Sequence, residues 1–257
     1  MLTHPRKLGY DFSNWEGKSV AYHVKKKFGV KLGVRAAQKL LRWLGLSLQR
    51  PRYKFPKANA EQQKEFVMAL KKKFDALTAN AIILFLDECS VQYAPTITRM
   101  WSLKGHQPEI SSYGGRKRQH LVGAVDPFGG EVRAGLSDSL KAEQLIHFLE
   151  GLIRFYANKE KIIVVLDNAR AHHAKAVQEF LKKYEGKIEL MFLPPYSPRL
   201  NPIERVWKKM RKAVTHNHFF ETFQKFLQAI VRFFSKFKKC SKKIRSLCSY
   251  QKIFNSL

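Results

Sequence analysis

Residues 81–88 read AIILFLDE, a short apolar run that carries acids at its carboxyl end. An apolar run of this length, bounded by polar residues, predicts a buried central strand. A second run, KIIVVLDN at residues 161–168, has the same form. Ligand sites in α/β sheets lie at the carboxyl ends of strands. We therefore expect Asp87 and Asp167 to end their strands and to face each other if these strands are neighbours.

The segments around these two runs complete an α/β pattern. Residues 118–136 predict two strands joined by a Pro–Gly turn, and residues 187–194 predict a further apolar strand. Amphipathic runs at 141–158 and 174–184 predict helices between the strands. The expected fold is a mixed α/β sheet flanked by helices and ribonuclease-H-like. We place it at residues 78–220, after a connecting helix at 58–77 and before a basic helical tail at 221–257.

The first 57 residues predict a small all-α domain of the winged helix-turn-helix kind. A helix with Val20, Val24 and Phe28 on one face is followed by GVKLG and then by a second helix from Val34 to Leu44. In that geometry the second helix enters the major groove of DNA. The alternative is a basic helical hairpin that only packs. The expected DNA contacts are Arg35, Gln38, Lys39 and Arg42 on this helix, with Arg50 and Arg52 in a basic wing at residues 49–55.

The charge of the chain indicates a polyanionic partner. Its 257 residues contain 48 Lys and Arg against 20 Asp and Glu, a formal net charge of +28. Each neutralised phosphate releases counterions, so this excess favours nucleic acid over a ribosome-associated or membrane-surface role. Three widely spaced cysteines give neither a disulfide framework nor a zinc pattern. No apolar run is long enough for a membrane span, so we expect a cytoplasmic, nucleoid-associated protein.

A stiff segment precedes a third acid. Residues 193–212 read LPPYSPRLNPIERVWKKMRK, in which prolines restrict the approach to a basic helix. Pro202 suits the first helical turn, with Asn201 as its cap. The loop can therefore deliver Glu204 to the ends of the two strands. The basic side chains expected to face phosphates are Arg205, Lys208, Lys209, Arg211 and Lys212.

Three converging carboxylates predict a site for a hard cation. Like charges at close range raise each other's pKa unless a cation lies between them, so the three acids favour a bound cation. Their oxygen ligands suit Mg²⁺ best. Two divalent cations can clamp the attacking and leaving oxygens of a phosphodiester displacement. Asp87, Asp167 and Glu204 are therefore the candidate catalytic and metal-binding residues.

Other polar residues have a structural interpretation. Strand alternation points Glu88 away from Asp87, and Asp126 and Asp138 lie in turn-like contexts. His172 and His173 either approach the site or belong to a helix entry, and Asn168 is expected to fix the loop after its strand. Trp101 either stacks on bases or packs, whereas Trp207 is expected to pack because it follows Ile203 by four residues on one helix face.

Four motifs, in this order, resemble those of the bacterial insertion-sequence branch of the mariner-superfamily transposases. They are FLDECS, RMWSLKGHQP, VVLDNARAHHAK and LPPYSPRLNPIERVWKKMRK. The resemblance covers about residues 18–220. It implies a ribonuclease-H-like DDE domain in which Asp87, Asp167 and Glu204 bind Mg²⁺ or Mn²⁺, most simply two ions. Asp167 follows Asp87 by 80 residues and Glu204 follows Asp167 by 37, a close pair typical of this superfamily.

The resemblance also implies cut-and-paste transposition, with a homodimer acting on the terminal inverted repeats of double-stranded DNA and on a TA target. Family members commonly carry a further helix-turn-helix upstream. The chain is therefore expected to be shortened, or to be the second product of a split or frameshifted gene. Two alternatives stay open: a catalytically silent transposase that acts as a DNA-binding regulator, and a ribonuclease-H-like nuclease that cuts without joining.

Overall fold

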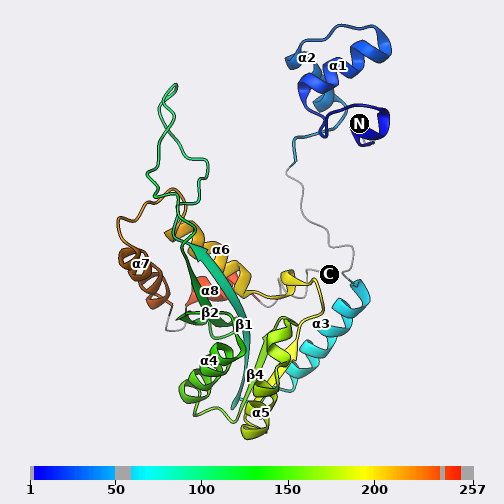
Figure 1. Cartoon of the computed structure of the whole chain (residues 1–257). Coiled ribbons are helices and arrows are strands. Elements are labelled where there is room, and N and C mark those ends of the chain that lie inside the picture. Colours follow the sequence, from blue (N-terminus) through cyan, green and yellow to red (C-terminus); the bar gives the residue numbers. More distant parts are fainter. Residues whose placement is uncertain (1–2, 50–58, 238–240, 250–257) are drawn as a thin grey trace. The chain divides into compact units, whose positions relative to one another are not determined.

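The computed structural model describes residues 3–49, 59–237 and 241–249. The chain divides into two compact units, Met1–Lys54 and Phe55–Leu257 (Figure 1). Each unit is described by itself. The predicted basic wing, with Arg50 and Arg52, lies almost wholly outside the described residues and stays a prediction.

The N-terminal unit is helical. Its elements are η1 (Pro5–Leu8), α1 (Gly17–Phe28) and α2 (Val34–Trp43). Helices α1 and α2 pack against each other around Val20 and Ala37, which are both fully buried. The first turn of α1 approaches α2 so closely that a Cβ on Gly17 would lie 2.9 Å from Val34 Cγ1. The two predicted helices are confirmed, and α2 ends one residue before the predicted end.

The second unit is built on one mixed sheet. Among the described residues its strands are β1 (Ala81–Gln92), β2 (Arg118–Asp126), β3 (Glu131–Ser137), β4 (Lys161–Leu166) and β5 (Ile188–Phe192). Their order is β3-β2-β1-β4-β5. The β1–β2 and β2–β3 pairs are antiparallel, whereas β1–β4 and β4–β5 are parallel. The predicted mixed sheet is therefore confirmed.

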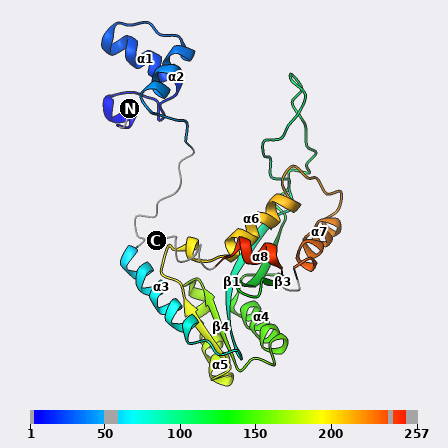
Figure 2. The ribbon, with the colours of Figure 1, turned by 180° about the vertical axis from the view of Figure 1, so that it is seen from behind.

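Helices cover both faces of this sheet. They are α3 (Ala60–Asp75), α4 (Ala142–Phe155), η2 (Arg170–His173), α5 (Lys175–Lys183), η3 (Pro198–Leu200), α6 (Ile203–Val214), α7 (Phe223–Ser235) and α8 (Lys242–Leu247). Side chains of α4 and α5 share one hydrophobic core with one face, and those of α3, α6, α7 and α8 share another core with the opposite face. Figure 1 and Figure 2 show the sheet between these two layers from opposite sides.

The alternation of β1 decides which helical layer each acid faces. Ile83 and Phe85 belong to the core on the α6 face, whereas Leu84 and Leu86 belong to the core under α4 and α5. Strand β4 alternates in the same way, with Val165 on the α6 face. Two residues further along the chain, Asp87 within β1 and Asp167 directly after β4 therefore both fall on the α6 side.

The predicted end of β1 at the acids is wrong. The strand continues for five residues beyond Asp87 to Gln92, and Asp87 itself is paired with Gly123 of β2. Only the parallel ladder with β4 stops early, at the pair Phe85 and Val165. The antiparallel partner keeps β1 extended after β4 has turned away. Asp87 thus lies inside a strand but at the point where the sheet opens.

The Phe-rich segment that follows α6 packs on the sheet. Helix α7 buries Phe226, Ile230, Phe233 and Phe234 in the core on the α6 face. Helix α8 adds Ile244, which is fully buried. The α7 and α8 segment is therefore part of the second compact unit, and both helices pack against α6.

Candidate active site

The three predicted acids meet at one pocket. A cavity of about 390 Å³ lies where β1 and β4 separate, and Asp87, Asp167 and Glu204 all line it. Its other walls come from Asn168 and Ala169 after β4, and from the proline-rich segment between β5 and α6. The structure therefore brings together side chains that lie far apart in the sequence.

Asp87 is held by Trp207 of α6. The indole Nε1 of Trp207 donates a hydrogen bond of 3.0 Å to Asp87 Oδ2. The indole lies so close to the sheet that a Cβ on Gly123, the β2 partner of Asp87, would come within 2.6 Å of Trp207 Cη2. A glycine at this position thus admits the ring that orients the acid. The predicted packing role of Trp207 is confirmed, since its side chain is fully buried.

The pocket disfavours the charged forms of Asp87 and Glu204 when no cation is present. Burial, and then the nearby charge of Glu204, raise the pKa of Asp87 to about 7, against the lowering effect of the Trp207 hydrogen bond. Burial of its carboxyl also raises the pKa of Glu204, against the lowering effect of the Arg211 charge, although the residue as a whole is exposed. Within the described ranges no Lys, Arg or His forms an ion pair with Asp87 or Glu204. In a chain this basic, such an acidic pocket fits a hard divalent cation.

Glu204 is delivered by the turn before α6. The helix begins at Ile203 with Pro202 as its N-cap, one residue later than predicted. Asn201 is nevertheless buried, and its Oδ1 accepts the Ile203 N–H at 3.3 Å. Its Nδ2 donates to the Leu86 carbonyl at 2.9 Å. One side chain therefore joins the start of α6 to the strand residue before Asp87.

We expect Asn201→Ala to lower the free energy of unfolding by about 1–3 kcal/mol, because the Leu86 carbonyl and the Ile203 N–H each lose a buried partner. Urea unfolding followed by circular dichroism measures this change. The matched control is Asn80→Ala, which removes an exposed hydrogen bond to Glu160 and should cost much less. Equal effects for both variants would contradict the role given to Asn201.

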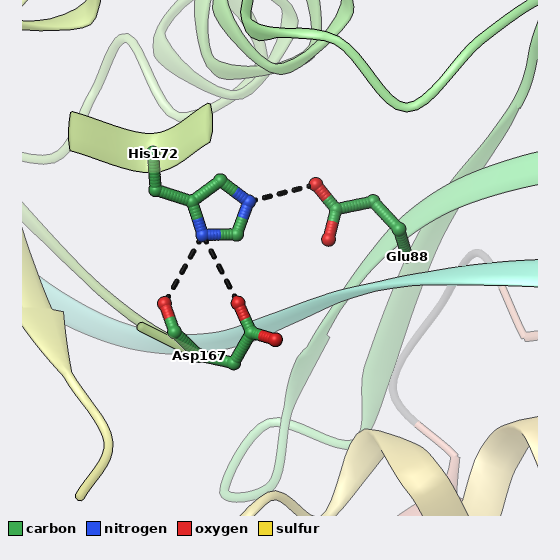
Figure 3. Close-up of side chains that lie close together, drawn as sticks. All are labelled: Glu88, Asp167 and His172. Atoms are coloured by element: carbon green, nitrogen blue, oxygen red, sulfur yellow. Dashed lines mark hydrogen bonds and ion pairs between the residues drawn. The ribbon is translucent and has the colours of Figure 1, made fainter. Parts of the chain in front are cut away.

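Asp167 is contacted from the other side by His172 (Figure 3). His172 is buried in η2, and its Nδ1 lies 3.1 Å from both Asp167 Oδ1 and the Asp167 carbonyl. Its Nε2 lies 3.0 Å from Glu88 Oε1. Burial lowers the pKa of His172, but the hydrogen bonds to Asp167 and Glu88 outweigh it and raise the pKa to about 10. The bond from His172 lowers the pKa of Asp167 in turn.

The sequence left open whether His172 approaches the site or belongs to a helix entry, and in the structure it lies in η2 and contacts Asp167. Alternation does point Glu88 away from Asp87, and its contact with His172 was not predicted. The sequence signal for His172 was its position five residues after Asp167, a distance that a single 3-10 turn closes. Asp126 is confirmed as a turn former, because its Oδ1 accepts the N–H groups of Phe128 and Gly129.

The predicted DNA contacts are spread over both units. On α2, Arg35, Gln38, Lys39 and Arg42 are all exposed. On α6, Lys208 and Lys212 are exposed, and Lys209 Nζ lies over the Phe237 ring. Arg205 donates to the Leu247 carbonyl at 3.3 Å, and Arg211 donates to Cys89 Sγ at 2.8 Å. Trp101 is fully exposed in the long β1–β2 connection. Their roles toward DNA stay predictions.

The sheet order and its flanking helices define a ribonuclease-H-like fold. Residues 82–227, more than half of the chain, match the family described as DDE superfamily endonuclease. Residues 11–70 match the family described as winged helix-turn helix. The chain therefore belongs to the DDE superfamily of endonucleases.

Similar proteins agree with this placement. The insertion element IS630 uncharacterized 39 kDa protein of Shigella sonnei is 25% identical over 216 residues, which are 83% of this chain and 62% of that protein. The chain thus spans less than two thirds of the length of this relative. The mariner Mos1 paired-end complex with Mg superposes with a TM-score of 0.66 at 19% identity, covering 94% of this chain and 71% of that one. The Mos1 strand transfer complex superposes with a TM-score of 0.57 at 18% sequence identity, covering 96% of this chain and 85% of that one.

None of the helices in the described ranges combines the length and apolarity that a membrane crossing requires.

Proposed function

We propose that this protein is a transposase that cuts DNA at the ends of its own insertion sequence and joins the freed ends to target DNA. The observation that carries the proposal is the meeting of Asp87, Asp167 and Glu204 at one pocket without a cationic side chain paired to Asp87 or Glu204 among the described residues. The family and the Mos1 complexes with Mg and with DNA ends support it.

The three carboxylates are the proposed ligands of Mg²⁺ or Mn²⁺, and their oxygens suffice to share two such ions. A bound divalent ion would supply Lewis-acid stabilisation of the scissile phosphate and would lower the pKa of a water molecule. The protein's own part is to hold the acids rigidly. Trp207 orients Asp87, and Asn201 fixes the start of α6 before Glu204.

The N-terminal unit is the proposed reader of the element ends. Helix α2 exposes Arg35, Lys39 and Arg42 on the side away from its buried Ala37, and Gln38 is exposed at the flank that approaches Gly17 of α1. This pattern suits insertion into a major groove, as in other helix-turn-helix proteins. By the same family resemblance we propose a homodimer on terminal inverted repeats, a TA target and action in the cytoplasm on the nucleoid.

The direct test is cleavage of a labelled duplex that carries the flanking ends of the gene's own element. Wild type and Asp167→Ala are compared with Mg²⁺, with Mn²⁺ and with a chelator. Cuts at the ends by wild type alone, abolished by the chelator, support the proposal, and joined products extend it to strand transfer. Cuts without joined products favour a nuclease, and binding without cleavage by either protein favours a DNA-binding regulator.

We expect Lys39→Ala to weaken DNA binding and to reduce the slope of log K against log salt concentration by about 1, because one phosphate contact releases about one counterion. Fluorescence anisotropy at several salt concentrations measures the slope. The control is Lys175→Ala, which removes an equal charge from the exposed start of α5. An unchanged slope for Lys39→Ala would exclude a phosphate contact by this side chain.

A further inference from the structure

Glu88 and His172 form a bridge across the point where the sheet opens. The β1–β4 ladder ends at Phe85 and Val165, so no strand pairing fixes Asp167 relative to β1. His172 spans this gap. One ring nitrogen contacts Asp167 and the other contacts Glu88 of β1, at 3.1 and 3.0 Å (Figure 3).

The Glu88 and His172 part of the bridge is buried, whereas the Asp167 end is exposed. The His172 side chain is 3% exposed and that of Glu88 15%, whereas that of Asp167 is 54% exposed. The contacts of Asp167 with His172 and with the Ala169 N–H both use Oδ1. Its Oδ2 points away from the imidazole (Figure 3). The contacts therefore fix Oδ1 of Asp167 and leave its Oδ2 directed away from His172.

We propose that Glu88 and His172 are positioning residues, which hold the Asp167 carboxylate in the orientation that the divalent-ion site requires. The inference rests on the proposed function, because it gives Asp167 the part of a ligand. Each member has a distinct task. Asp167 meets the ion, His172 fixes Asp167, and Glu88 fixes the His172 ring to β1, the strand that also carries Asp87.

A separate ion site at the bridge is the competing arrangement. Ligand atoms of Glu88, Asp167 and His172 do lie within 4.8 Å of one another. However, each ring nitrogen already has a carboxylate oxygen at hydrogen-bond distance, so the imidazole offers no further lone pair to an ion. The exposed acid of the three is the one that also lines the pocket. We therefore assign the bridge to the support of Asp167. Outer partners of this kind typically change metal affinity by about 10–100-fold.

The test uses the full chain and Mn²⁺ as the probe, with bound and free ion separated by electron paramagnetic resonance. Wild type is compared with His172→Ala, Glu88→Ala, the double variant and the conservative Glu88→Gln. Cleavage of the labelled duplex is measured in parallel. His120→Ala is the matched control, because its imidazole also bonds to β1, at Ser90, but touches no acid of the pocket. Thermal unfolding shows whether each variant is folded, and His172→Gln replaces His172→Ala if the latter is not.

We expect both single alanine variants to lose Mn²⁺ affinity by about 10–100-fold. The double variant should lose little more than either single one, since the two residues act as a unit. Glu88→Gln, which keeps an acceptor for His172, should stay close to wild type, as should His120→Ala.

Three results would overturn the inference. If both single alanine variants bind Mn²⁺ and cleave DNA like wild type, the proposed function stands, but Glu88 and His172 are not positioning residues for it. Mn²⁺ binding that survives in an Asp87→Asn/Glu204→Gln variant and disappears in His172→Ala makes His172 a ligand instead. Absence of both Mn²⁺ binding and cleavage in wild type overturns the proposed function and this inference together.

Discussion

Glu204→Gln is expected to slow metal-dependent strand cleavage by about 1,000-fold or more, which corresponds to about 4 kcal/mol in the activation free energy. Glutamine keeps the shape of the side chain at the pocket but removes the negative charge that a divalent ion requires. Single-turnover cleavage of the end-bearing duplex, at saturating Mg²⁺ and then with a titration of Mn²⁺, measures the loss.

The same substitution should leave the fold intact and even stabilise it. Glu204 raises the pKa of Asp87, so the two carboxylates repel each other in the metal-free protein, and a neutral side chain relieves that repulsion. Urea unfolding without metal tests this opposite effect. The control Glu179→Gln changes an exposed glutamate of α5 and should alter neither quantity. Cleavage by Glu204→Gln at the wild-type rate would remove Glu204 from the site.

Trp207→Ala is expected to cost about 3–5 kcal/mol of the free energy of unfolding, the usual range for a fully buried tryptophan. The indole fills the space over Gly123 and packs edge-on against Phe234 of α7. Its removal would open a cavity between α6 and the sheet. Equilibrium unfolding in urea gives the value, and a change below about 1 kcal/mol would contradict this packing.

Trp207→Phe separates packing from the hydrogen bond to Asp87. Phenylalanine fills much of the same space but has no N–H for Asp87 Oδ2. We expect a smaller loss of stability, about 1–3 kcal/mol, together with slower cleavage. Cleavage at the wild-type rate by a folded Trp207→Phe protein would show that the hydrogen bond does not orient Asp87.

Local patterns in the sequence were sufficient to predict most elements of the sheet and helices. The apolar runs at 81–88 and 161–168 are buried strands because both of their faces are covered, as continuous hydrophobicity indicates. The predicted end of β1 was wrong for a physical reason. The polar residues after Asp87 favoured termination, but an antiparallel partner 30 or so residues later, β2, keeps the strand extended.

Contacts within the candidate site depend on residues distant in the chain, which periodicity does not reveal. The prediction that Asp87, Asp167 and Glu204 converge followed from strand ends and a stiff loop. The hydrogen bonds of Trp207 to Asp87 and of His172 to Glu88 join residues separated by 120 and 84 positions. Such pairs become visible only once the strand order and the helix faces are fixed.

The central claim is that Asp87, Asp167 and Glu204 together form one divalent-ion site. Its most direct test is the anomalous difference density of Mn²⁺ in crystals of the full chain grown with and without MnCl₂. We predict anomalous peaks in contact with carboxylate oxygens of these three residues, and their loss in crystals of Asp87→Asn. A peak held by Glu88 and His172 instead, or no peak at the pocket in Mn²⁺-containing crystals, would contradict the account.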